Sequence, residues 1–314
     1  MQTPWTARHV PRSRPPGNWS CPVCGGVDGR DRWAVPEAAT EGGVDAASFR
    51  PSSDRFGAVA ATVICCGDCG HGSLAHLPDA VSMSGAYEGA VDPVSLREER
   101  GQVETATRAL RIIERFVSPA AMLDVGCWTG SFLVAARDRG WSVSGIEPSR
   151  WAAARAEARG VDVVESELGA ADRSSDRYQA IVMCDVLEHL GDPGTALEVV
   201  RSMLDPHGVL YLTVPDAGSI AARVMGRRWW SVLPMHVQYF TRASMGRLLV
   251  ERGFAVRHVR SHAKVFTAGY YAERLGGYGP RLERPVEAAL RALRVEGRLV
   301  APNFFDRMEV IASR

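Results

Sequence analysis

The sequence contains a single lysine, Lys264, although its basic and acidic residues nearly balance. There are 37 lysine plus arginine residues against 36 aspartate plus glutamate residues, so the formal net charge is +1. A chain with so little net charge has no overall field that would hold nucleic acid or an anionic membrane. It also lacks an uninterrupted apolar run of about 18 residues, so we expect no membrane-spanning helix.

The N-terminus lacks the apolar core of a secretory signal and contains Pro11, Pro15 and Pro16. We therefore expect residues 1–18 to form a disordered tail and the protein to be cytoplasmic, with reduced cysteines. The chain has 314 residues, of which 46% are hydrophobic. This is enough for one α/β domain of ordinary size and a small additional module.

Five of the seven cysteines lie within the first 70 residues, in a pattern typical of a metal site. They include two C-x-x-C pairs, each followed by glycine, which are Cys21 with Cys24 and Cys66 with Cys69. Four thiolates at this spacing predict one structural Zn²⁺ in a zinc ribbon over residues 19–78. A redox pair would need one C-x-x-C near a βαβ unit, and disulfides would need an oxidising compartment. Alternative ligands nearby are Cys65, His71 and His76.

Two apolar segments end in acids on either side of a glycine turn. The first reaches Asp124 and then turns through Gly126 and Gly130, and the second, 142–147, ends at Glu147. This is the nucleoside-binding layout of a doubly wound sheet, in which Glu147 can accept hydrogen bonds from both ribose hydroxyls. A dinucleotide fingerprint would need G-x-G-x-x-G, whereas three residues separate the two glycines here. The spacing therefore argues against an NAD-dependent dehydrogenase.

Several motifs together resemble those of class I S-adenosylmethionine (SAM) dependent methyltransferases. They are Leu123–Gly130, Ile146–Ser149, Cys184–Leu190 with Asp192-Pro193, and Leu210–Asp216. The segments Pro234–His236 and Tyr239–Thr241 resemble those of a subgroup with an N-terminal zinc-binding module. One departure is Trp128, which stands where the family usually has glycine; its ring either reshapes the cofactor pocket or points away from it.

The resemblance implies an α/β fold, with a doubly wound, seven-stranded Rossmann-like methyltransferase sheet. It also implies SAM as cofactor. The cofactor-binding residues that it implies are Asp124, Gly126, Cys127, Trp128, Gly130, Glu147, Pro148, Glu167 and Asp185. Among these, Glu167, or Glu165 beside it, would bond the adenine amine. Cys127 and Cys184 lie in or beside expected core strands, so they can also be interpreted as small buried hydrophobic residues.

Hydrophobic patterns place the remaining boundaries. Residues 79–118 are expected to form a linker followed by an amphipathic helix over 95–116. Residues 119–314 are expected to form the methyltransferase domain. Within it we expect an insertion at 262–303 that can cover the acceptor pocket. The expected strands are 33–35, 58–65, 121–125, 142–147, 161–165, 178–184, 209–214, 254–260 and 307–312. The last of these is expected at an edge of the sheet, antiparallel to its neighbour. Expected helices are 130–139, 149–160, 194–204, 241–253 and 282–297, and Ser149 and Thr241 are the expected N-caps.

Three polar residues near the expected carboxyl ends of the fourth and fifth strands can carry chemistry. A hydroxyl acceptor needs a base, and His236, then His189, are the candidates, with Glu188 beside them. Each also has a structural interpretation: a backbone hydrogen bond for either histidine, and bracing of the turn for Glu188. Similarly, Arg227–Trp230 either grips an anionic or ring-shaped acceptor or is a packed tryptophan with solvated arginines.

The sequence therefore predicts methyl transfer from SAM to a hydroxyl of a small-molecule or glycan acceptor, in polysaccharide or secondary-metabolite tailoring. One alternative is a C-methyltransferase acting on a nucleotide-linked keto-sugar. Such enzymes share the N-terminal cysteines, but they carry a further C-terminal domain that we do not expect here. A second is an RNA methyltransferase, which would need a basic surface where residues 19–78 carry more acids than arginines. The third is a binding module without catalysis, suggested only by Trp128. The sequence does not predict an oligomeric state.

Overall fold

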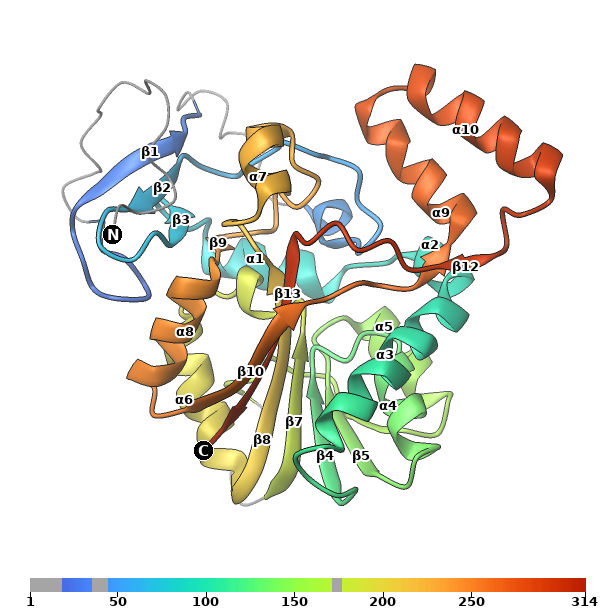
Figure 1. The fold of residues 1–314 in the computed structure, drawn as a ribbon. Helices are drawn as coiled ribbons and strands as arrows, with labels where there is room; N and C mark the ends of the chain where they lie inside the picture. Colours follow the sequence, from blue (N-terminus) through green and yellow to red (C-terminus); the bar gives the residue numbers. More distant parts are fainter. Residues whose placement is uncertain (1–18, 36–44, 171–176) are drawn as a thin grey trace.

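The computed structural model describes residues 19–35, 45–170 and 177–314; the tail expected at 1–18 lies outside them. Its largest unit is a seven-stranded mixed sheet in the order β10-β13-β8-β7-β4-β5-β6 (Figure 1). Five strands are parallel neighbours: β4 (Ala121–Val125), β5 (Ser142–Ile146), β6 (Asp162–Val164), β7 (Tyr178–Cys184) and β8 (Leu204–Pro215). The expected α/β class and seven-stranded sheet are therefore confirmed.

The expectation that the last strand lies at an edge of the sheet is wrong. Strand β13 (Arg307–Ser313) pairs antiparallel with β8 on one side and with β10 (Ala255–Ser261) on the other. All five residues from Met308 to Ala312 are buried, whereas β10 alternates between exposed and half-buried residues. A strand buried along its whole length needs partners on both sides, so β10 takes the edge.

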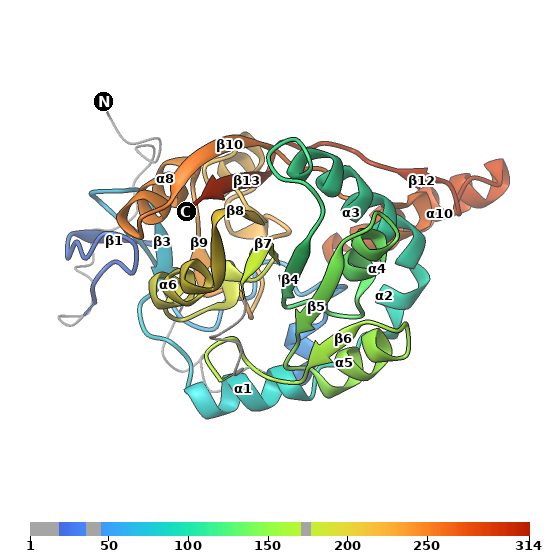
Figure 2. The ribbon, with the colours of Figure 1, turned by 90° about the horizontal axis from the view of Figure 1, so that it is seen from below.

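Helices cover both faces of this sheet, because successive strand residues point to opposite faces. On one face Met122, Ala180 and Tyr211 pack against α3 (Glu99–Ile113) and α4 (Ser131–Arg137). On the other, Leu123, Ile181 and Leu212 pack against α6 (Pro193–Met203) and α8 (Arg242–Glu251). Figure 2 shows α3 and α4 on the opposite side of the strands from α6.

Local signals located the helix starts well. Ser149 caps α5 (Arg150–Glu157) and Thr241 caps α8, each accepting a backbone N–H of the first turn, as predicted. The helix expected over 95–116 is instead two helices, α2 (Pro93–Arg97) and α3. Asp92 caps α2 through its side chain, and the chain turns at Glu98 before α3 begins.

The N-terminal residues form a second sheet that the methyltransferase part of the chain completes. Its order is β1 (Gly29–Trp33), β2 (Val63–Cys66), β3 (Gly72–Leu74) and β9 (Gln238–Tyr239). The strands expected at 33–35 and 58–65 are thus shifted. Val59 and Ala60 are apolar because they pack on the cluster around Trp229, not because they extend a strand. The pairing of β3 with β9 ties the two parts into one unit.

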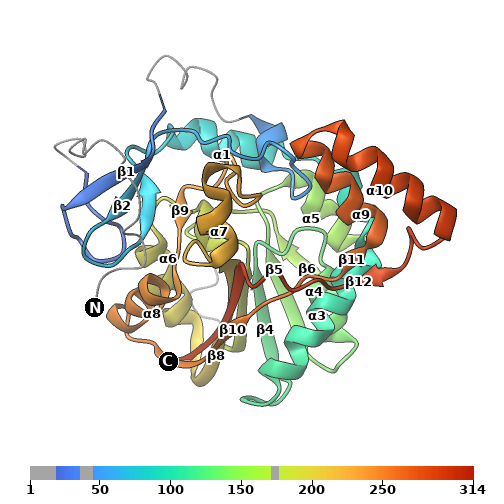
Figure 3. The same ribbon diagram turned by 45° about the horizontal axis from the view of Figure 1, so that its top comes forward.

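Two regions expected to contain little structure are helical. The linker contains α1 (Ala80–Glu88), capped by Asp79, as well as α2. The insertion expected to hold one helix has β11 (Phe266–Thr267), α9 (Ala268–Glu273), a 3-10 turn (Arg274–Tyr278), α10 (Pro280–Leu293) and β12 (Leu299–Val300). Figure 3 shows the N-terminal sheet and α9–α10 on opposite sides of α7 (Ile220–Met225). Within the described ranges, no helix is both long and apolar enough to cross a membrane.

Candidate functional site

A cavity of about 620 Å³ opens at the carboxyl ends of the parallel strands. The ends of β4, β5, β7 and β8 contribute Gly126, Glu147, Asp185 and Thr213 to its wall. Aromatic residues close it from two directions, from the N-terminal part of the chain (Phe49, Phe56, Tyr87) and from the insertion (Phe266, Tyr270, Tyr271, Tyr278). The insertion thus lines the cavity, and its expected role as a cover of the acceptor pocket stays a prediction. Such a volume suits a small-molecule site.

The turn after β4 is built by two glycines with positive φ. Gly126 has φ 71°, and a Cβ there would lie 2.7 Å from Val186 Cγ2. Gly130 has φ 77°, and a Cβ there would lie 3.0 Å from the Cβ of Ala156 in α5. Gly126 lines the cavity, whereas Gly130 does not. The second glycine therefore serves the packing of α4 against α5, and its expected contact with the cofactor stays a prediction.

Glu147 is the buried carboxylate at the end of β5. Its Oε2 accepts a hydrogen bond from the Trp128 N–H and its Oε1 accepts one from the Ser149 N–H, both at 2.8 Å. Burial raises the pKa of Glu147 to about 7, although these two bonds oppose the shift. A carboxylate offers about four acceptor positions. Two remain to receive ribose hydroxyls from the cavity, so the residue fits the expected nucleoside.

Trp128 neither closes the cavity nor turns away from it. Its φ of 49° explains why glycine is usual here, since few side chains tolerate that conformation. The indole N–H donates to Ser95 Oγ at 3.0 Å, and the ring lies 5.6 Å from that of Trp151. The indole is thus held against α2 and forms part of the cavity wall.

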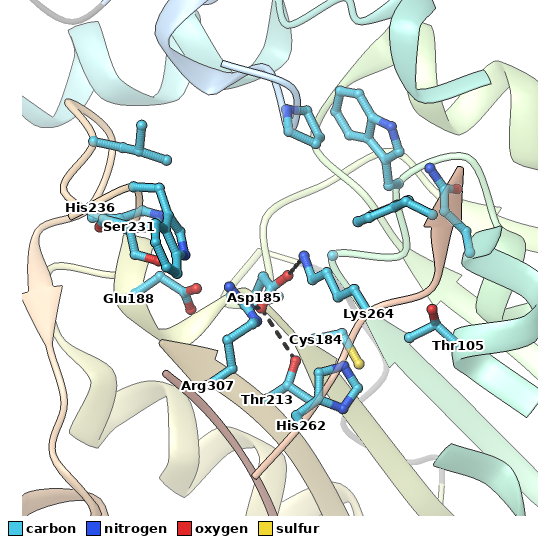
Figure 4. A pocket seen from close by; sticks show the side chains of 18 of the residues that line it. Thr105, Cys184, Asp185, Glu188, Thr213, Ser231, His236, His262, Lys264 and Arg307 are labelled. Carbon is cyan, nitrogen blue, oxygen red and sulfur yellow. Dashed lines mark hydrogen bonds and ion pairs between the residues drawn. The ribbon is translucent and has the colours of Figure 1, made fainter. Parts of the chain in front are cut away.

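Asp185 forms ion pairs with two basic side chains that the sequence analysis did not predict. Lys264 and Arg307 each form an ion pair with its carboxylate, and Thr213 Oγ1 donates to it at 3.3 Å. Asp185 itself has φ 59°, directly after β7. Figure 4 shows Lys264 and Arg307 meeting Asp185 in the middle of the cavity. No local signal in the sequence marks this pairing, because Asp185, Lys264 and Arg307 lie far apart in the chain.

Glu188, His189 and His236 come together on one side of the cavity, where Figure 4 labels Glu188 and His236. One ligand atom from each lies within 4.8 Å of the others. The histidine Nδ1 atoms bond to main-chain oxygens, His189 to Met235 at 3.1 Å and His236 to Ser231 at 2.7 Å. The three expected catalytic residues are thus neighbours.

Burial shifts the pKa of the carboxyl group and the pKa values of the two imidazoles in opposite directions. It raises the pKa of Glu188 to about 8 and lowers that of His236 to about 4. Burial, together with His236, also lowers the pKa of His189 well below its usual value. Both histidines are therefore neutral at neutral pH. Both Glu188 oxygens are buried and have no hydrogen-bond partner in the described part of the chain.

The backbone of Val237 links this cluster to the N-terminal sheet. Its N–H donates to the carbonyl of Glu188 at 2.8 Å, and its carbonyl accepts from the Leu74 N–H at 3.1 Å. Beside it, His71 Nε2 and Gln238 Oε1 lie 2.9 Å apart. The position of His236 is therefore fixed by main-chain bonds to both parts of the molecule.

Two further residues expected to bind the cofactor lie outside the cavity wall. Asp124, Cys127 and Trp128 line the cavity, but Pro148 and Glu167 do not. Glu167 is exposed and accepts a hydrogen bond from Ser84 Oγ at 2.7 Å, and its expected bond to the adenine amine stays a prediction. Asp124 is buried, and this raises its pKa well above the usual value, with a further contribution from Glu147.

The segment Arg227–Trp230 has mostly structural contacts. Trp229 is fully buried and its indole N–H donates to Asp306 at 3.0 Å. Arg227 Nε donates to the carbonyl of Gly57 at 2.7 Å. Only Trp230 lines the cavity, packed edge-on to Phe304. Trp229 and Arg227 therefore have structural contacts, and Trp230 is the residue of this segment that faces the cavity.

The four expected zinc ligands also form one cluster. Cys21 and Cys69 have their sulfurs 3.6 Å apart, as do Cys24 and Cys66. Four thiolates around one Zn²⁺ at about 2.3 Å would have sulfur–sulfur distances of roughly 3.8 Å. The alternatives point elsewhere, since the Cys65 thiol contacts the Cys66 carbonyl and His71 contacts Gln238. The four sulfurs are therefore placed to hold one metal ion.

The fold and the cavity define a class I SAM-dependent methyltransferase. A family model described as a methyltransferase domain matches residues 97–259, more than half of the chain, and the chain belongs to that family. Ubiquinone biosynthesis O-methyltransferase from Aeromonas salmonicida (strain A449) is 26% identical over 150 residues. That match covers 43% of this chain and 63% of the relative, so the chain spans less than two thirds of the relative's length.

Similar solved structures include two methyltransferases. Magnesium protoporphyrin IX methyltransferase from Synechocystis PCC 6803 with bound SAH has 15% identity and a TM-score of 0.48, covering 72% of this chain and 89% of that one. A SAM-dependent methyltransferase from Mesorhizobium loti has 19% identity and a TM-score of 0.46, covering 67% and 98%.

Removing one ligand of the cysteine cluster should release its metal. We expect Cys69→Ser to contain about one zinc per chain less than the wild type, because three thiolates bind Zn²⁺ far more weakly than four. Cys65→Ser is the matched control and should keep the wild-type zinc content. Elemental analysis of the purified proteins measures both. Equal zinc in all three proteins would contradict a zinc site at these four residues.

Truncating the carboxylate at the end of β5 should weaken cofactor binding. We expect Glu147→Ala to lower the affinity for SAH, the demethylated product, by about 1–3 kcal/mol, because it removes the acceptor of the ribose hydroxyls. Glu157→Ala, on the exposed side of α5, should bind normally. Isothermal calorimetry measures both affinities. Tight NAD binding by the wild type, with no SAH signal, would refute the assignment.

The raised pKa of Glu188 should make stability depend on pH. Between about pH 4.5 and 8 folding takes up a proton at this carboxyl, so its contribution to the free energy of unfolding falls as pH rises. The buried neutral histidines act oppositely below about pH 6.5. From pH 6.5 to 8, the wild type should therefore lose up to about 1.4 kcal/mol per pH unit relative to Glu188→Gln.

Urea denaturation at several pH values measures this difference between the two proteins. Glu157→Gln is the control, because its exposed side chain should add no such difference. Parallel stability profiles for wild type and Glu188→Gln would mean that Glu188 titrates normally.

Proposed function

We propose that this enzyme transfers the methyl group of SAM to a hydroxyl of a small-molecule or glycan acceptor. The observation that carries the proposal is that one cavity contains both the cofactor-motif residues and the cluster of Glu188, His189 and His236. Methyl transfer requires the two reactants to meet in line in one closed space. The partial similarity to a ubiquinone O-methyltransferase is in keeping with an oxygen acceptor.

The residues divide the cavity into two halves. In the cofactor half, Glu147 would bind the ribose, while Gly126 and Trp128 form the adjoining wall. SAM supplies an already activated methyl group on a sulfonium. In the acceptor half, which we define by Glu188, His189, His236 and the aromatic side chains beside them, the protein has to orient a hydroxyl and accept its proton.

A proton acceptor is available in the acceptor half. Because Nδ1 of His236 donates to the Ser231 carbonyl, its Nε2 carries a lone pair. The lowered pKa keeps this imidazole neutral at pH 7, and Glu188, with a pKa near 8, is the stronger base when ionised. As the oxygen receives the methyl group, the hydroxyl proton passes to one of these two groups.

The cavity wall also suggests the character of the acceptor. Phe56 and Tyr278 stack 5.1 Å apart, and Arg274 lies 4.6 Å above the Phe56 ring. Rings of this kind favour a flat or apolar acceptor, including the apolar faces of a sugar. We therefore favour a small ring-bearing alcohol, as in natural-product or glycan tailoring. We further propose that the four-cysteine cluster binds a structural Zn²⁺, since four thiolates leave no open position for catalysis.

Removing the imidazole of His236 tests the proposed role of this cluster. We expect His236→Ala to reduce turnover about a hundredfold while SAH affinity stays nearly unchanged, because the proton acceptor is lost but the ribose site is not. His207→Ala, at an exposed position of β8, is the control and should keep full turnover. Turnover is measured as transfer of label from SAM to an acceptor isolated by screening extracts.

The reverse result has a clear meaning. If His236→Ala and His189→Ala both retain full turnover, the acceptor is a carboxylate or an amine, which needs no base. Methylation of a hydroxyl would then be wrong. Product analysis by mass spectrometry and NMR separates O-methylation from C-methylation of a keto-sugar.

A further inference from the structure

Three side chains in the acceptor half of the cavity converge on one point in a way that proton transfer alone does not require. We propose that Glu188, His189 and His236 together bind one divalent transition-metal ion. Their ligand atoms lie within 4.8 Å of one another, as around a single ion. They come from two separate segments, the turn after β7 and the residue before Val237, which main-chain bonds hold together.

The carboxylate of Glu188 is the first argument for a cation. The side chain is 1% exposed, and neither oxygen has a hydrogen-bond partner in the described ranges. Leaving a buried carboxyl without partners costs several kcal/mol in general. The charge of Lys264 also acts on Glu188, but its ammonium group is paired with Asp185. A metal ion among the three groups would satisfy the oxygens that the protein leaves without partners.

The histidines have the orientation that metal ligands need. In each ring Nδ1 faces a main-chain carbonyl, of Met235 for His189 and of Ser231 for His236. A carbonyl can only accept, so Nδ1 carries the proton and Nε2 keeps its lone pair. Metal-binding histidines are held in this way by a second hydrogen bond.

The donor set indicates the class of ion. Two imidazoles and one carboxylate suit Mn²⁺, Fe²⁺, Co²⁺ or Zn²⁺, whereas Mg²⁺ and Ca²⁺ prefer oxygen ligands. The nearby positive charges are already paired, because Lys264 and Arg307 both contact Asp185. Three protein ligands also leave coordination positions open, in contrast to the four-cysteine cluster.

The open positions give the ion a role that rests on the proposed function. A hydroxyl bound to the ion has a lowered pKa. Its proton can leave to water, and the oxygen then forms its bond to the methyl carbon as the bond from that carbon to the sulfonium sulfur breaks. His236 would in this case be a ligand and not the base. No oxidant or reductant is needed.

Metal titration tests the site without any acceptor. The full chain, with zinc retained in its cysteine cluster, is titrated with Mn²⁺, and free Mn²⁺ is followed by electron paramagnetic resonance; Zn²⁺ is tested in parallel by calorimetry. Mn²⁺ is chosen because thiolates do not select it. We expect the wild type to bind about one ion per chain. Glu188→Gln and His236→Ala should each bind the ion with an affinity lower by a factor of about a hundred or more. Glu157→Gln, at an exposed position of α5, should bind as the wild type does.

Normal SAH affinity in the variants shows that they remain folded, so weaker metal binding is attributable to the lost ligand. The proposal is overturned if the wild type binds neither ion, or if both variants bind it unchanged. Failure of the metal site leaves O-methylation intact when His236→Ala still loses turnover. Conversely, if the wild type binds the metal as expected while the product is methylated on a nitrogen or a carboxylate, only the proposed function is contradicted.

Discussion

The main-chain bonds of Val237 are the constraint on which the site depends. One bond reaches Glu188 in the turn after β7, and the other reaches Leu74 in the N-terminal sheet. The chain between β8 and β10 is therefore held at both sides where His236 enters the cavity. Without β3 and its neighbours, β9 would have no partner and the histidine no fixed position. This arrangement gives the N-terminal module a direct part in building the acceptor half.

The carboxylates at the ends of the strands are buried by the same packing of the two parts of the chain. Glu147 uses its carboxylate to hold the Trp128 turn against the start of α5, and the bonds offset part of its desolvation. Glu188 has no such bonds, so burial shifts its pKa further. The first carboxylate is organised by the protein alone, whereas the second is left for a ligand, a proton or an ion. That difference is the physical basis of the two halves that we propose for cofactor and acceptor.

The sequence predicted those features that local chemistry determines. Strand β4 and the caps Ser149 and Thr241 were located because apolar runs and side-chain caps act within a few residues. The position of β13 was not, since pairing on both sides depends on burial that only the complete fold creates. The contacts of Asp185 with Lys264 and Arg307 were missed for the same reason, because they join residues far apart in the chain. The hydrogen bond between Ser84 and Glu167 was also missed, because it joins residues far apart in the chain.

A crystal structure of the protein with SAH tests the central claim most directly, namely that one cavity brings the cofactor and the acceptor groups together. The account predicts ribose hydroxyls bonded to Glu147 and the sulfur of SAH facing Glu188 and His236 across open space. It would be contradicted if the ribose lay away from Glu147, or if the sulfur pointed to a wall from which neither residue can be reached.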